Sequence, residues 1–196
     1  PLFLTQFLGA FNDNLYKNAL VVLVTFQSAQ WTSMRPEILA NLAAGLFILP
    51  FFFFSATAGQ LADKYDKAML ARLTKMLEVG IMIVAIAGFL LHSLALLLAA
   101  LFLLGLQSTL FGPVKYAILP QHLHTDELIG GNALIEAGTF VAILVGTLAG
   151  GLLAGSVEHP AWIALGGFVV AAAGYVMSRG IPAAPPPAPN LTVNPN

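Results

Sequence analysis

Six long apolar runs constrain this chain more than any other feature, because each has the roughly 20 residues that an α-helix needs to cross a bilayer. The runs cover residues 2–27, 36–61, 69–91, 93–112, 127–155 and 160–179. Only 9% of the residues are charged, against about 25% in soluble domains. The runs are also too long and continuous for the alternating strands of a membrane barrel. We therefore expect an all-α membrane protein, a bundle of six transmembrane helices within residues 1–179.

The remaining composition excludes several function classes. The net charge of −1 gives no reason to expect a nucleic-acid partner, and the absence of cysteine excludes disulfides and thiolate chemistry. His122 and His124 are close in sequence, but no second cluster of metal-ligating residues accompanies them. No nucleophile elbow or phosphate-binding loop is present. We expect no enzyme, no metal site and no cofactor in this segment.

Residues 180–196, GIPAAPPPAPNLTVNPN, are rich in proline and polar side chains. This composition favours extended, solvated chain, so we expect a linker rather than a seventh span. The sequence also starts at Pro1 inside an apolar run, so we expect it to be part of a longer protein.

The distribution of lysine and arginine predicts the orientation of the bundle. The second and fourth loops, their flanks and the end of the last run hold Lys64, Lys67, Arg72, Lys75, Lys115 and Arg179. The opposite side has only Arg35. Because basic residues concentrate on the cytoplasmic side, we expect the even-numbered loops and both termini to be cytoplasmic.

The first run contains a polar stretch, FNDN, where apolar side chains would be expected. A helical projection places Gln6, Gly9, Ala10, Asp13, Lys17 and Leu20 on one face. Asp13 and Lys17 are spaced for an ion pair within the helix, which would be a structural role. The alternative is a charged wall of a substrate pathway. The flanking Asn12 and Asn14 favour this second interpretation, because an ion pair alone does not need them.

The fourth run ends in LGLQSTLFGPVKYAIL, where Ser108, Gly112 and Lys115 share a face. Pro113 predicts a kink or the end of the helix. Lys115 then has two possible roles. It can reach into the mouth of a cavity, or it can extend its ammonium group to the membrane surface.

In the fifth run, one stripe of the helix carries the polar residues Asn132, Glu136, Thr139 and Thr147 together with Ile143. Glu136 lies too deep in the helix for a simple interface charge, and either substrate contact or a buried structural hydrogen bond would explain it. The glycines at positions 146, 150, 151 and 155 have the spacing that lets membrane helices approach closely, so we expect a structural role for them.

The second loop reads GQLADKYDKAMLAR. Asp63 or Asp66 is placed to cap the following helix, since a carboxylate is favoured at a helix N-terminus. A capped turn and the orientation rule explain the acidic and basic residues, but they do not explain why Gly59 accompanies them.

This loop resembles the signature G-x-L-A-D-[RK]-x-G-[RK] of the major facilitator superfamily. Six residues fit it, namely Gly59, Leu61, Ala62, Asp63, Lys64 and Lys67, and Asp66 replaces the second glycine. The stretches FLGAFNDN, GPVKYAIL and NALIEAGTFVAILVG further resemble the bacterial lysophospholipid transporter family. FNDNLYKNAL is especially similar to members fused to acyltransferase and acyl-acyl-carrier-protein ligase domains.

The resemblance implies a twelve-helix transporter of the bacterial inner membrane, with this chain as its N-terminal six-helix half. The implied substrate is a lysophospholipid, such as lysophosphatidylethanolamine, delivered for re-acylation. The implied partners are membrane lipids, the C-terminal half and a fused acyltransferase and ligase. Alternatives from the same fold class are an exporter of drugs or metabolites, or a membrane anchor for the fused enzyme.

The resemblance also assigns residues to roles. Asp13 and Lys115 match positions that handle the lipid head group, and the predicted substrate-binding set is Asp13, Asn14, Lys17, Lys115, Asn132 and Glu136. Gly59, Asp63, Lys64 and Lys67 form the predicted conformational latch. One carboxylate and one ammonium can pair with the two charges of a zwitterionic head group, while apolar walls accept the acyl chain.

Overall fold

The apolar runs fold into six helices in the computed structural model, which describes residues 1–27, 31–156 and 159–194. The helices are α1 (Leu2–Phe26), α2 (Pro36–Lys64), α3 (Lys67–Leu90), α4 (Leu94–His122), α5 (Leu128–Ser156) and α6 (Ala161–Ser178). Five of them, α2 to α6, are long and apolar enough to cross a membrane. These helices confirm the expectation of an all-helical, multi-pass membrane protein.

Helix α1 is not among those five, although its 25 residues give a length of about 37 Å against a hydrocarbon core of about 30 Å. Its middle carries Asn12, Asp13, Asn14 and Lys17, which lower the hydropathy of the helix. The first three of these side chains are buried in the bundle. The polar face of α1 is therefore buried in the protein interior, because exposing it to lipid would be energetically costly.

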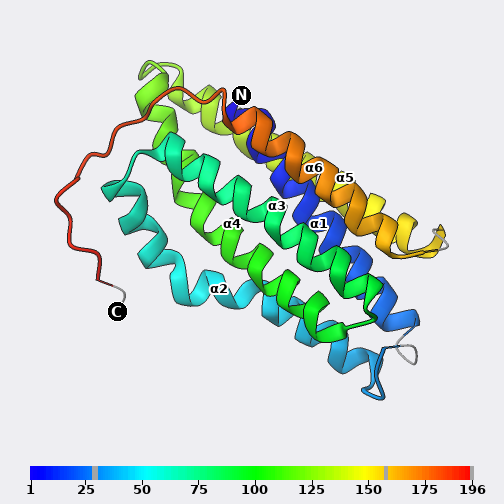
Figure 1. Ribbon diagram of the computed structural model, residues 1–196. Helices are drawn as coiled ribbons and strands as arrows, with labels where there is room; N and C mark the ends of the chain where they lie inside the picture. The colour runs from blue at the N-terminus through cyan, green and yellow to red at the C-terminus, as the bar shows by residue number, and fades with distance from the viewer. Residues whose placement is uncertain (28–30, 157–158, 195–196) are drawn as a thin grey trace.

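Helix α1 occupies the middle of the bundle (Figure 1). It packs against α5 and α6, while α3 packs against α4 and α6, and α2 packs against α4. We call the end of the bundle that holds the α2–α3 loop, the α4–α5 loop, Pro1 and Arg179 the basic end. The side chains of Lys64 and Lys67 lie there.

Two glycines of α5 explain its close packing on α1. A Cβ placed on Gly146 would lie 2.5 Å from the backbone oxygen of Phe11, and one on Gly150 would lie 2.4 Å from that of Leu15. Both distances are far below van der Waals contact, so only glycine permits this approach. The structural role predicted for these two glycines is confirmed. A Cβ on Gly151 or Gly155 would meet no described atom within 4 Å.

Helix α4 is longer than the sequence predicts. It runs through Pro113 and Pro120 to His122, so the expected helix end near residue 112 is wrong. Beyond Pro113 the helix buries Val114 and Ile118 in a second apolar cluster with α3, and this packing outweighs the loss of a backbone hydrogen bond. As a result, Lys115 belongs to a helix and not to a loop.

The α2–α3 loop contains a single helix cap. Asp66 is the N-cap of α3, and its side chain accepts a hydrogen bond from the backbone nitrogen of Met69 at 2.8 Å. Asp63, the other predicted candidate, is an exposed residue in the last turn of α2. The expectation that an aspartate caps this helix is confirmed for Asp66.

Residues 180–194, which we call the strap, form extended chain that lies along the basic end (Figure 1). Ile181 and Ala184 are buried in the second apolar cluster, with 1% and 0% of their surface exposed. Backbone groups of the strap bond to three helices, through Asp63 of α2, Lys67 of α3 and His122 of α4 among others. The strap is therefore extended but docked on the bundle, and the expectation of solvated chain is wrong at Ile181 and Ala184.

Candidate functional site

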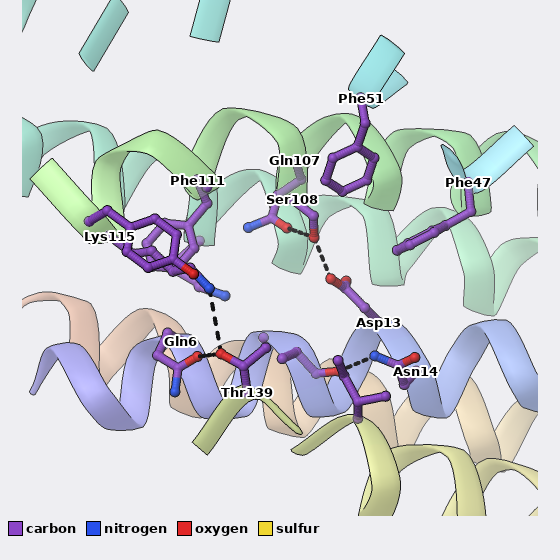
Figure 2. A pocket seen from close by; sticks show the side chains of 16 residues that line it. Gln6, Asp13, Asn14, Phe47, Phe51, Gln107, Ser108, Phe111, Lys115 and Thr139 are labelled. Carbon is purple, nitrogen blue, oxygen red and sulfur yellow. Dashed lines mark hydrogen bonds between the residues drawn. The ribbon is translucent and has the colours of Figure 1, made fainter. Parts of the chain in front are cut away.

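A pocket of about 390 Å³ lies between α1, α2, α4 and α5 (Figure 2), and Lys75 of α3 also lines it. Its polar lining consists of Gln6, Asp13, Asn14, Lys75, Gln107, Ser108, Lys115, Tyr116 and Thr139. Phe47, Phe51 and Phe111 supply aromatic walls. Ser108, Gly112 and Lys115 all line it, which confirms the face predicted for α4.

Asp13 lies at the centre of this arrangement, buried and 6% exposed. Its Oδ2 atom accepts a hydrogen bond from the hydroxyl group of Ser108 across the pocket (Figure 2). The ion pair with Lys17 is not formed in the described part of the chain. The direct contact of Asp13 is therefore with α4 across the pocket and not an ion pair within its own helix.

Lys17 instead donates a hydrogen bond to Asn14 Oδ1 at 2.9 Å and lies over the ring of Phe47 at 4.9 Å from its centroid. Asn14 donates in turn to the backbone oxygen of Ala10 at 2.8 Å. Asn14 lines the pocket, whereas Lys17 lies one turn further along α1, outside the lining. A cation over an aromatic face keeps a favourable contact in a half-buried place.

Lys115 reaches the pocket from the basic end. Its Nζ atom lies 3.5 Å from Thr139 Oγ1 and 4.6 Å from the centroid of the Tyr116 ring. Thr139 donates to Gln6 Oε1 at 2.8 Å, so a polar chain joins α4, α5 and α1 (Figure 2). Lys115 is thus directed into the protein, as the cavity interpretation predicts, and not only toward a membrane surface.

Glu136 and Asn132 lie outside the pocket lining. Glu136 accepts a hydrogen bond from the Tyr116 hydroxyl group and is 3.9 Å from Lys115 Nζ, with 42% of its side chain exposed. It is therefore a neighbour of the pocket at the rim. Asn132 donates to the backbone oxygen of Leu128 in its own helix at 2.8 Å. Of the predicted substrate-binding set, the structure brings together Asp13, Asn14 and Lys115, with Glu136 beside them.

A buried ion pair next to the pocket was not recognised in the sequence. Lys75 Nζ lies 2.7 Å from Glu78 Oε2, and both side chains are 1% exposed. Asn12 donates to the other carboxylate oxygen of Glu78 at 2.8 Å. The sequence analysis counted Lys75 among the basic flanks of the second loop, and that interpretation is wrong, because Lys75 lies two turns inside α3 and points into the bundle. A lysine and a glutamate three residues apart in an apolar helix were the available signal.

The predicted latch residues lie at the basic end, under or beside the strap. Lys67 is buried and donates to the backbone oxygen of Pro185 at 3.3 Å. Asp63 accepts at its backbone oxygen from Ala188. Lys64 lies over the ring of Tyr65, and a Cβ on Gly59 would meet no described atom within 4 Å. These four residues share one end of the molecule, while the pocket lies within the bundle.

The sequence also matches known proteins. The sequence profile of the Major Facilitator Superfamily matches residues 2–195. The chain belongs to the Major Facilitator Superfamily. The family predicted from the signature loop is confirmed. The fold also agrees, since a crystal structure of the peptide transporter POT in complex with alafosfalin matches 97% of this chain and 40% of that protein, with a TM-score of 0.65 and 22% identity.

Within the Major Facilitator Superfamily, the chain is similar to lysophospholipid transporters named LplT. It is 31% identical to LplT of Klebsiella pneumoniae subsp. pneumoniae over 173 residues, which are 87% of this chain and 38% of the relative. It is 32% identical to LplT of Escherichia coli strain SE11, over 76% of this chain and 34% of the relative. For LplT of Pectobacterium carotovorum, the identity is 29% over 90% of this chain and 39% of the relative. The chain therefore spans less than half the length of these curated relatives.

The arrangement of charges limits what this superfamily pocket can bind. The pocket offers a carboxylate at Asp13 and ammonium groups at Lys115 and Lys75, and its walls include the aromatic rings of Phe47, Phe51 and Phe111. Charged side chains this deep in a membrane bundle are costly and usually serve a substrate or an ion.

Proposed function

We propose that the full-length protein carries lysophospholipids, in the first place lysophosphatidylethanolamine, across the bacterial inner membrane. The observation that carries the proposal is the pocket, in which Asp13 and Lys115 lie apart inside the helical bundle. The ethanolamine group would pair with Asp13 and the phosphate with Lys115. The LplT relatives support a single-chain phospholipid as the substrate.

Orientation and partners belong to the same proposal. The basic end would face the cytoplasm, because Lys64, Lys67 and Arg179 lie there. A second six-helix half would complete the pocket, with the strap as the start of the connection to it. A fused acyltransferase and ligase would receive the lipid on the cytoplasmic side. Gly59, Asp63, Lys64 and Lys67 would form the latch between the transport states.

Uptake and binding of lysophosphatidylethanolamine by the full-length protein test the proposal. Replacement Lys115→Ala should weaken binding by roughly tenfold to a hundredfold, since one charge-assisted contact is worth about 1.5–3 kcal/mol. Lys115→Arg should retain more affinity than Lys115→Ala, because phosphate pairing depends first on the charge. Asp13→Asn should lower affinity for the zwitterionic lipid, with expression matched across all variants.

The same assay separates the alternatives. If Lys115→Ala binds as tightly as the wild type, Lys115 is an interface residue and the site assignment fails. Transport of drugs or metabolites without lysophospholipid uptake would identify an exporter. Normal re-acylation in the Asp13→Asn and Lys115→Ala variants, with no uptake even by the wild type, would identify a membrane anchor.

A further inference from the structure

The floor of the pocket holds two buried amide donors that have no hydrogen-bond partner among the described residues, and Asp13 Oδ1 is a buried acceptor that also has none. Gln6 and Gln107 both line the pocket and are 3% and 1% exposed. The amide nitrogen of each makes no hydrogen bond to the described residues. Buried polar groups in proteins are nearly always hydrogen-bonded, because an unsatisfied one costs free energy. Two unpaired amide donors on residues that line the pocket therefore suit a ligand that accepts hydrogen bonds.

Lys75 adds an ammonium group to the same floor. Its Nζ atom has three N–H donors, and among the described residues only Glu78 Oε2 accepts from it. The ring of Phe111 lies 4.9 Å from Nζ and holds the ammonium from one side. A Cβ placed on Gly9 would lie 2.0 Å from Nζ, so the ammonium reaches the pocket through the space that this glycine leaves.

Glu78 stands behind this ammonium and not in the pocket. Its two carboxylate oxygens are held by Lys75 and Asn12, and its side chain is 1% exposed. Glu78 is also absent from the pocket lining, whereas Lys75 belongs to it. The carboxylate therefore balances the lysine charge from outside the pocket and leaves the ammonium to face a ligand.

We propose that Lys75, Gln6 and Gln107 form a phosphate subsite on the floor of the pocket, with Glu78 and Asn12 as positioning residues for the lysine. The inference rests on the proposed function for the identity of the lipid, and it adds a second cation to the one at Lys115. Ammonium and amide donors together suit a phosphate group, whose oxygens accept several hydrogen bonds at once. Asp13 remains for the positive part of the head group.

Three ligands and the full-length protein test this subsite. The ligands are lysophosphatidylethanolamine, a monoacylglycerol with the same acyl chain and no phosphate, and glycerophosphoethanolamine with no acyl chain. Lys75→Gln should weaken the two phosphate-containing ligands by roughly tenfold to a hundredfold and leave the monoacylglycerol unchanged. Glu78→Gln should retain or tighten phosphate binding, because it removes the opposing charge and keeps the ammonium. If the ion pair were only structural, Lys75→Gln and Glu78→Gln would both lower ligand affinity.

The double variant Lys75→Gln/Glu78→Gln is the control for folding, because it removes both charges of the pair and leaves neither of them unbalanced. It should regain thermal stability relative to either single variant and still lose phosphate binding. Gly9→Ala should also weaken phosphate binding, because its Cβ displaces the ammonium. Wild-type affinity in the double variant, or equal losses for the monoacylglycerol, would overturn the subsite. Lys75-dependent binding of glycerophosphoethanolamine without any lysolipid uptake would overturn the proposed function and support the subsite.

Discussion

Replacement of Gly150 by alanine should separate α1 from α5. The new Cβ would lie 2.4 Å from the backbone oxygen of Leu15 and 3.1 Å from the backbone nitrogen of Ala19. The first distance is about 1 Å short of ordinary van der Waals contact, and a backbone carbonyl within a helix cannot rotate away. The two helices must therefore move apart by a similar amount. Overpacking of this kind costs about 1–3 kcal/mol.

Gly151→Ala is the matched control, since the change is the same, the helix is the same, and the new Cβ would meet no described atom within 4 Å. Gly80→Ala in α3 is a second control with equally open surroundings. Alanine favours a helix over glycine by about 1 kcal/mol, so the controls should match or exceed wild-type stability. The measurement is the free energy of unfolding, or the thermal midpoint, of the full-length protein in detergent. Equal stability of the Gly150→Ala and Gly151→Ala variants would refute the argument for close helix packing.

Three further predictions concern the basic end. Asp66→Ala should lower stability by about 1 kcal/mol, because α3 loses its cap, and equal thermal midpoints would contradict this role. Asp63→Asn should leave the fold intact and slow lysolipid transport, and an unchanged initial rate would remove Asp63 from the latch. Single cysteines at Ser33 and Tyr65, which are both exposed, should react with impermeant reagents from opposite sides of the membrane. Labelling from one side only would overturn the topology. The sequence alone would suggest Ser28 and Lys67 for this labelling, but Lys67 is buried and Ser28 lies outside the described residues.

The helical bundle was predictable because its signal is local. Each run of apolar residues predicts a membrane helix without reference to the rest of the chain. For five helices, the predicted boundaries differ little from those of the structure. The exception is α4, where Pro113 indicated a helix end. Whether a helix continues past proline depends on what the following turns can bury, and that surface comes from α3 and the strap, which are distant in sequence.

The site was only partly predictable for a related reason. Asp13 and Lys115 stand out because a single charge in an apolar run needs an explanation. Lys75 has an ordinary explanation as a basic flank of a loop. In the structure it lies over the ring of Phe111 of α4, and its partner Glu78 binds Asn12 of α1, so its surroundings come from helices that are distant in sequence. The docking of the strap has little compositional signal. Its polar contacts use backbone groups at Ile181, Ala184 and Pro185, and its apolar contacts bury only the small side chain of Ala184 and that of Ile181, so little in the composition marks them.

The docked strap changes where the chain leaves the bundle. Arg179 ends α6, but the strap remains attached through Ala184 at Asp66 and through Asn194, whose backbone groups bond to Gln60 of α2. Any chain that continues from this point is tethered beside α2 and not beside α6. The strap residues are already held on the bundle, so they add no flexible length to that connection. A protease that cut between Pro185 and Asn194 would therefore release the tether and leave the six helices intact.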